Sequence, residues 1–347
     1  METTLFRYLD DLASRIDAPQ EERKRREWED FLNDRWPGDY FHPSERVPSP
    51  PKIDWPAVSV NAAMGDFDAM LLQQFRGCSE TLASGGAAPL AVRCNYGSSI
   101  LPSLFGVELF LMAEELNTLP TSHPLHSTDA IRRLVDAGVP DLHTGLGGKV
   151  FEAAGRFLEA LESHPVLRRH IDLYHPDVQG PMDAAEVIWG SDIFYAFGDE
   201  PELLTAFLNL ITETYIAFMR RWYELVPQTR DWSTHWSMAH KGALMLRNDS
   251  LMNLSPAMYV EYVRPFDQRL FDEFGGGAIH FCGRGDHFIE PLSQLRGLHA
   301  VNVAQPHLNN METVLRHTVD KGIKLIGLGP GTVESLGLPL RGQVHCG

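Results

Sequence analysis

From about residue 58 onward, the chain alternates short apolar runs with longer amphipathic helical patterns. Because the alternation continues over about 290 residues without a long break, it predicts strands that each lead into a helix, and so one parallel α/β sheet, closed or open. The runs that predict strands are 88–94, 141–144, 173–179, 236–239, 277–282, 300–303 and 323–328. The patterns that predict helices include 201–223, 256–274 and 311–321.

The N-terminal part of the chain has a different pattern. Residues 1–36 show two amphipathic helical patterns, and the second carries charges of both signs around Trp28 and Phe31. Mixed charges at helical spacing favour a solvated helix that packs on a larger body. The proline-rich run 37–56 has no period and predicts an extended connector. We therefore predict an N-terminal helical extension and connector over 1–57 and one α/β domain over 58–347.

Charge and hydropathy limit the classes of partner. The chain has 46 acidic and 30 basic residues and a formal net charge of -16, which disfavours binding to nucleic acid or to an anionic membrane. No run approaches the roughly 18 apolar residues of a spanning helix, and residues 1–16 lack a signal-peptide pattern. We therefore expect a cytoplasmic protein whose four cysteines are thiols or metal ligands.

The strongest chemical motif is His280-Phe281-Cys282-Gly283 at the end of an apolar run. Residues i and i+2 of a strand point to the same face, so an imidazole and a thiol would project together from the strand end. Nitrogen and sulfur ligands suit Zn²⁺. The alternatives are a core histidine bonded to a carbonyl and a cysteine that packs as a small apolar residue.

Cys346 is a candidate third metal ligand. It lies near the end of the printed chain, and the final strand of a closed sheet lies beside its first strand, so it could return to the same edge. Three protein ligands with one open position are typical of catalytic zinc. The alternative is that Cys346 belongs to a frayed terminus.

Five further polar residues follow predicted strands or precede helices, where an α/β barrel would place its site. Asp249 precedes the helix that starts near residue 255, and it could act as a general acid or base or orient a ligand; the alternative is a turn or cap. Asn95 and Tyr96 follow one strand and could line a substrate pocket. Asn302 and Gln305 come at the strand after His280 and could do the same.

Several short motifs occur together in a characteristic order. They are Asn95-Tyr96-Gly97, Leu104-Phe105-Gly106, Gln179-Gly180-Pro181, Ser255-Pro256-Ala257-Met258-Tyr259, Pro265-Phe266-Asp267 and His280-Phe281-Cys282-Gly283. Over residues 85–330 this order resembles the uroporphyrinogen decarboxylase superfamily. The resemblance implies an α/β fold of the (β/α)8 TIM-barrel type, which would occupy 58–347 behind the helical extension.

Within that superfamily, the His-x-Cys motif and the distant cysteine are similar to the zinc site of coenzyme M methyltransferases and, more distantly, of cobalamin-independent methionine synthase. The resemblance implies a zinc-dependent methyltransferase, with Zn²⁺ held by His280, Cys282 and Cys346. A methyl group would move between a corrinoid or methylated pterin donor and a metal-activated thiol. It also implies a small-molecule substrate and a corrinoid protein as a partner, and it leaves a homo-oligomer open.

One departure separates the chain from true uroporphyrinogen decarboxylases. Nothing before residue 90 matches the arginine-rich motif with which those enzymes hold the carboxylates of a porphyrinogen. Two alternative functions remain. One is a metal-free decarboxylase or related lyase in which His280 and Cys282 only pack, and the other is a non-catalytic binding barrel.

Overall fold

The computed structural model describes residues 2–347. Helices α1 (Glu2–Arg15) and α2 (Ala18–Leu32) confirm the two N-terminal helical patterns. Helix α2 begins after Asp17, whose carboxylate accepts the N–H of Gln20 and so satisfies a free donor of the first turn. Residues 33–58 form no helix or strand of more than one residue.

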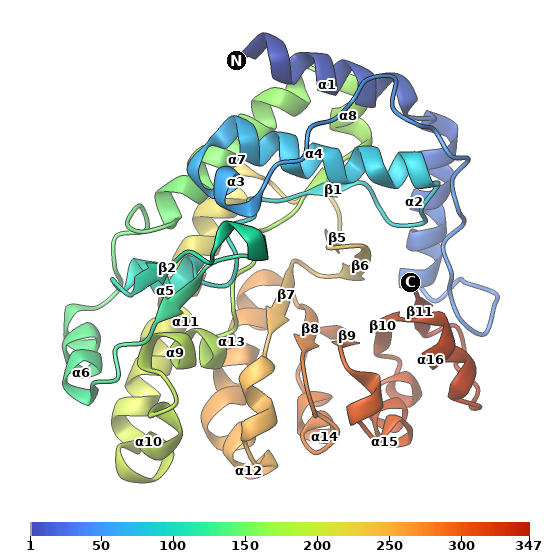
Figure 1. Cartoon of the computed structure of the whole chain (residues 1–347). Coiled ribbons are helices and arrows are strands. Elements are labelled where there is room, and N and C mark those ends of the chain that lie inside the picture. The colour runs from blue at the N-terminus through green and yellow to red at the C-terminus, as the bar shows by residue number, and fades with distance from the viewer. Residues whose placement is uncertain (1) are drawn as a thin grey trace.

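The main sheet has five parallel strands, in the order β11-β10-β9-β8-β7. The strands are β7 (Leu244–Arg247), β8 (Gly277–Phe281), β9 (Leu298–Val303), β10 (Lys324–Leu328) and β11 (Val344–Cys346). In Figure 1 they follow one another along an arc, with their connecting helices outside it. The strands predicted at 277–282, 300–303 and 323–328 are confirmed.

Three smaller strand pairs accompany this sheet. Strands β1 (Ala91–Val92) and β4 (Asp172–Leu173) pair in parallel. The other two pairs are antiparallel hairpins: β2 (Glu108–Phe110) with β3 (Thr121–His123), and β5 (Trp232–His235) with β6 (Met238–Lys241). The protein is therefore a mixed α/β protein, and a closed eight-stranded barrel stays a prediction.

One strand prediction is wrong, and another is confirmed only in part. Residues 141–144 form a turn in which Thr144 N–H donates to the carbonyl of Asp141. The turn brings Gly147 against the carbonyl of Leu142, where a Cβ would clash. The strand predicted at 236–239 overlaps β6 at Met238 and Ala239, but β6 pairs antiparallel with β5. Trp236 lies in the turn between the two strands, with a left-handed φ of 52°. Side chains alternate between the two faces in parallel and antiparallel strands alike, and a run of four residues does not fix the direction of the strand with which it pairs.

The predicted long helices are present. Helix α11 (Pro201–Leu225) confirms the helix at 201–223. The helix at 256–274 consists of α12 (Pro256–Met258), a π-helical turn (Tyr259–Val263) and α13 (Arg264–Phe274). The pattern at 311–321 becomes α15 (Met311–His317) followed by a 3-10 turn (Val319–Lys321). None of the helices in residues 2–347 is long and apolar enough to cross a membrane.

The remaining helices surround the strands (Figure 1). They are α3 (Val60–Gly65), α4 (Phe67–Ser84), α5 (Ile100–Leu104), α6 (Thr128–Ala137), α7 (Gly147–Glu162), α8 (Pro165–His170), α9 (Pro181–Trp189), α10 (Ile193–Asp199), α14 (Ile289–Leu292) and α16 (Pro330–Ser335). Short 3-10 turns lie at Glu114–Leu116, Asp249–Asn253 and Pro306–Leu308.

The two faces of the main sheet pack against different partners. Ile279 and Phe281 of β8 belong to the large apolar cluster that includes the outer helices. On the other face, Ala278 of β8 and Ala300 of β9 belong to a smaller cluster with Met238 of the β5–β6 hairpin and residues of α2. Small side chains there leave room for the hairpin, which lies on the concave side of the arc (Figure 1).

Asp267 of α13 is a fully buried carboxyl that accepts a hydrogen bond from Asn248 Nδ2 at 2.9 Å. Burial raises the pKa of Asp267 to about 7, against the hydrogen bonds from Asn248 and Tyr259. A carboxyl whose pKa is raised by folding contributes its full stabilisation below its pKa in the unfolded chain, near 4. This stabilisation is lost as pH rises through the pKa in the folded protein.

We therefore expect the free energy of unfolding to fall more steeply between about pH 4 and pH 7 in the wild type than in Asp267→Asn. Urea denaturation at several pH values measures both slopes. The exposed residue Asp129 provides the control variant Asp129→Asn. Equal slopes for wild type and Asp267→Asn would show that Asp267 ionises normally in the folded protein.

Candidate metal centre

Asp249, His280 and Cys282 come together where β7 and β8 end. Asp249 opens the 3-10 turn that follows β7, and the other two lie at the end of β8. His280 Nε2 lies 3.4 Å from Cys282 Sγ and 3.6 Å from Asp249 Oδ1, and one ligand atom from each residue lies within 4.8 Å of the others. A tetrahedral zinc ion separates nitrogen, oxygen and sulfur ligands by roughly 3.3–3.6 Å. The donor set and its spacing fit zinc.

Asn302 fixes the orientation of the His280 ring. Its Oδ1 lies 2.6 Å from His280 Nδ1, and its Nδ2 donates to the carbonyl of Ile326 at 2.7 Å. Because the amide nitrogen is committed to Ile326, the oxygen faces the imidazole and accepts its Nδ1 proton. The lone pair of Nε2 then points toward Asp249 and Cys282, as metal-binding histidines require.

Backbone N–H groups hold the Asp249 segment in place. The Asp249 carboxylate accepts the N–H of Cys282 at 2.7 Å, which ties the two strand ends together. The buried carboxyl of Asp183, on α9, accepts the N–H groups of Asp249 and Ser250, each at 2.8 Å. Burial, and then the charge of Asp249, raise the pKa of Asp183 to about 8.

The pKa shifts of His280 and Cys282 suit a metal site. They leave the imidazole neutral and the thiol protonated unless a cation is bound beside it. Burial lowers the pKa of His280, against the hydrogen bond to Asn302, so the imidazole is neutral near pH 7. Burial, and then the carboxylate of Asp249, raise the pKa of the Cys282 thiol to about 11. A cation bound among the three side chains would lower the pKa of the Cys282 thiol.

A buried charge cluster lies beside the centre, and the sequence did not predict it. Asp177, which follows β4, pairs with Arg93 Nη1 at 2.8 Å and with Arg247 Nη1 at 2.5 Å. The guanidinium of Arg247 lies 4.9 Å from the ring centroid of Trp236. Trp236 in turn packs edge-on against His280, with ring centroids 4.8 Å apart. The turn of the β5–β6 hairpin is therefore part of the wall of the site.

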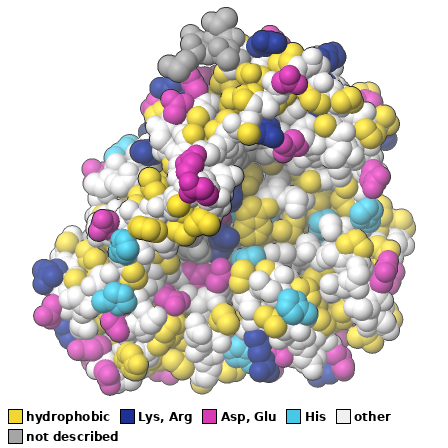
Figure 2. Space-filling view, in the orientation of Figure 1, with side chains coloured by type: hydrophobic (Ala, Val, Ile, Leu, Met, Phe, Trp, Pro, Cys, Tyr) yellow, Lys and Arg dark blue, Asp and Glu magenta, His cyan; other side chains and the backbone are white. Residues whose placement is uncertain are grey.

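Figure 2 shows the molecule hollowed near the middle of the face seen in Figure 1, with hydrophobic side chains on the floor and charged and histidine side chains around the rim. The hollow lies in front of the β5–β6 hairpin. It provides an approach from solvent to the concave side of the arc.

The predicted substrate-binding residues have different surroundings. Asn302 contacts His280, and Gln305 Oε1 accepts the N–H of Gly283 at 2.6 Å, so both hold the candidate ligands in position. Tyr96 is buried within the large apolar cluster. The Oδ1 atom of Asn95 is buried without a hydrogen-bond partner among the described residues. Their contact with a substrate stays a prediction.

Cys346 is not among the three side chains that the described structure brings together. It lies beside Leu328 of β10, and strands β9 and β10 separate it from β8. Its buried side chain belongs to the outer apolar cluster with Val344, whereas His345 packs on the opposite side against Trp28. The role of Cys346 as a ligand stays a prediction.

The fold and the centre together define a mixed α/β protein with a candidate metal site at Asp249, His280 and Cys282. No family model matches the sequence, and none of the curated proteins matches it. Among solved structures, the chain is similar to a methyltransferase from Methanosarcina mazei, with a TM-score of 0.56 and 14% identity over 88% of this chain and 89% of that chain. At this identity the likeness establishes the fold alone.

Proposed function

We propose that this chain is a zinc-dependent methyltransferase of the uroporphyrinogen decarboxylase superfamily. A methyl group would move between a corrinoid or methylated pterin donor and a thiol acceptor. The observation that carries the proposal is the convergence of Asp249, His280 and Cys282, in which His280 Nε2 lies from each of the other two at a separation that matches tetrahedral zinc. The fold shared with the Methanosarcina mazei methyltransferase supports the same class of activity.

We further propose a closed (β/α)8 barrel around this centre. Backbone hydrogen bonds beyond the five-stranded sheet support it. Gly180 N–H donates to the carbonyl of Arg247 in β7, and Phe41 N–H donates to the carbonyl of Val344 in β11. Phe41, β1 and the segment from β4 to Gly180 would supply the three further strand positions. The site would then lie at the carboxyl ends of the strands, where such barrels bind substrates.

Each residue of the centre has a defined task in this proposal. Bound zinc would lower the pKa of an acceptor thiol and so supply a thiolate near neutral pH. Asn302 keeps the Nε2 lone pair of His280 available. The Cys282 N–H orients the carboxylate of Asp249. Three protein ligands leave a fourth position for the acceptor.

The ligand set can be tested with two variants. We expect Asp249→Asn to bind zinc much more weakly than wild type, and Cys346→Ser to retain about one zinc per chain. Elemental analysis and competition with a chromophoric chelator measure both. The reverse result, in which Cys346→Ser loses zinc and Asp249→Asn retains it, would replace Asp249 by Cys346 as the third ligand.

The activity can be tested with simple probes. Zinc-loaded protein is incubated with methylcobalamin and a panel of low-molecular-weight thiols, and the loss of methylcobalamin absorbance is followed. A parallel series uses 5-methyltetrahydrofolate as the donor. We expect methylated thiol to appear only with the zinc-loaded protein. Methylated thiol at equal rates with metal-free protein would contradict the proposed chemistry.

A metal-free lyase is the second candidate. The cluster of Arg93, Asp177 and Arg247 favours it, because two guanidinium groups share one carboxylate and retain N–H donors for an anionic substrate. The nearby carboxyl of Asp183, with its pKa raised to about 8, could act as an acid near neutral pH. Turnover of a carboxylated substrate that is unaffected by zinc removal would establish this function.

A further inference from the structure

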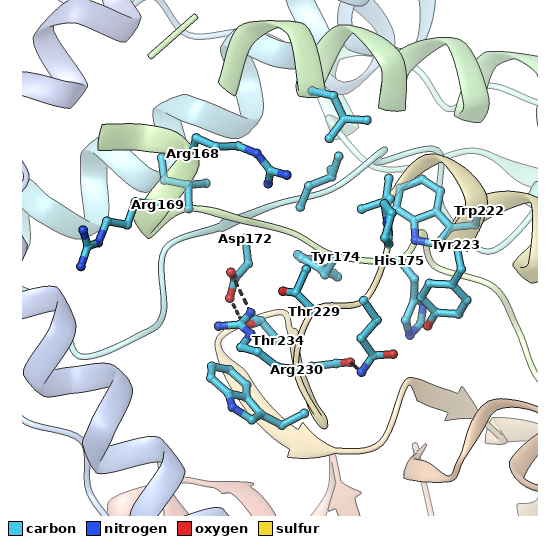
Figure 3. A pocket seen from close by; sticks show the side chains of 18 of the residues that line it. Arg168, Arg169, Asp172, Tyr174, His175, Trp222, Tyr223, Thr229, Arg230 and Thr234 are labelled. Atoms are coloured by element: carbon cyan, nitrogen blue, oxygen red, sulfur yellow. Dashed lines mark hydrogen bonds and ion pairs between the residues drawn. The ribbon is translucent and has the colours of Figure 1, made fainter. Parts of the chain in front are cut away.

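A second cavity, of about 320 Å³, lies away from the candidate metal centre. It is bordered by the end of α8, the start of β4, the end of α11 and the start of β5 (Figure 3). The cavity therefore borders β4 and the amino end of β5, whereas Asp249, His280 and Cys282 lie where β7 and β8 end. Its volume falls within the roughly 300–1,000 Å³ range of small-molecule sites.

The charge of this cavity is opposite to that of the whole protein. The chain has a formal net charge of -16, yet the cavity is lined by four arginines and one acidic residue, Asp172. Asp172 is already engaged, because it pairs with Arg230 at 2.8 Å and accepts the hydroxyl of Thr234 at 2.6 Å. An excess of guanidinium groups in a concave site attracts anions.

The two arginines at the end of α8 differ in what they contact. Arg169 pairs with Glu22, and Figure 3 shows its side chain pointing away from the cavity. Arg168 extends over the cavity in the same view, and it has no ion-pair partner among the described residues. Arg168 is therefore the arginine with its full set of N–H donors available to a ligand.

The opposite wall of the cavity is lined by aromatic side chains. The guanidinium of Arg230 stacks on Trp232, 3.7 Å from the ring centroid. Trp222 and Tyr223 at the end of α11 line the same space. Trp222 and Trp232 are only 1% and 6% exposed, so these rings give the cavity an apolar border of small area beside the cations.

We propose that this cavity binds a small organic anion, whose oxyanion group is held by Arg168 and whose apolar portion lies toward the aromatic residues of the opposite wall. The shared chemistry is a carboxylate or phosphate on a small apolar group. The site is separate from the zinc centre and does not depend on the proposed methyl transfer.

Isothermal titration calorimetry on the full chain tests the proposal with four probes. Adenosine monophosphate and indole-3-acetate carry a ring and an anionic group, and adenosine and indole carry the ring alone. We expect at least one anion to bind and its neutral counterpart to bind at least about tenfold more weakly. Whether adenosine monophosphate or indole-3-acetate binds shows whether the site takes a phosphate or a carboxylate.

Two variants locate the binding. Arg168→Gln is expected to weaken the anion at least about tenfold, and Arg169→Gln, its exposed neighbour, to leave the affinity unchanged. Both positions are exposed, so both variants should fold. The proposal is overturned if neither anion binds at millimolar concentration, or if the two variants weaken binding equally. Either failure leaves the zinc content of the protein, and hence the proposed function, untouched.

Discussion

Replacing Cys282 by serine is expected to reduce zinc affinity by more than about 100-fold, beyond the roughly 10–100-fold that loss of an outer hydrogen-bond partner costs. The thiolate is the ligand that zinc binds most strongly in this set, and a serine hydroxyl does not ionise near neutral pH. Competition with a chelator at pH 7, together with elemental analysis, measures the change. Methyl transfer should be lost in the same variant.

Cys78 provides the matched control. It is a buried thiol on α4 that donates to the carbonyl of Ala91 at 3.5 Å. It is not among the three candidate ligands. Cys78→Ala should keep about one zinc per chain with unchanged affinity. Should Cys282→Ser bind zinc as tightly as Cys78→Ala does, the metal centre and the function built on it would both be refuted.

Replacing Asp177 by alanine is expected to destabilise the fold by about 3–5 kcal/mol. The variant leaves the guanidinium groups of Arg93 and Arg247, only 14% and 17% exposed, without their common partner. Burial raises the pKa of Asp177, but His235 and the two arginines outweigh it and hold the pKa far below its ordinary value. Urea denaturation at pH 7 measures the loss.

The pH dependence supplies a second check on Asp177. Stability from a depressed carboxyl pKa is present above the unfolded value and is lost as pH falls. The difference between wild type and Asp177→Ala should therefore shrink below about pH 4. Asp30, whose pair with Arg35 is exposed, is the control, and Asp30→Ala should cost about 0–1 kcal/mol. Similar losses for Asp177→Ala and Asp30→Ala would contradict the buried cluster. If Asp177→Ala does not fold, Asp177→Asn gives the comparison.

The pairing of His280 with Cys282 could be predicted from the sequence, because side-chain alternation along a strand is a local property. The contact between His280 and Asn302 could not. These two residues are opposite each other in the register of β8 and β9, and register depends on how two distant segments align. Asn302 was therefore expected beside a substrate, whereas it binds the imidazole.

The charge cluster and the hairpin were missed for a related reason. Arg93, Asp177 and Arg247 come from three separate segments, and no spacing in the sequence links them. The turn at Trp236 contains neither glycine nor proline, so the usual signal for a hairpin is missing. Side chains alternate along β11, and Cys346 therefore points to the face opposite His345. The presence of a cysteine in the sequence does not reveal to which face it points.

The position of the hairpin in the chain has a consequence for how this protein could change its chemistry. Strands β5 and β6 lie within the connection between α11 and β7, yet their turn delivers Trp236 against His280. The candidate ligands come from the ends of β7 and β8, whereas this aromatic wall comes from one continuous segment. The surroundings of the candidate metal site could therefore evolve, or be engineered, by exchanging that single segment while β7 and β8 keep their sequence.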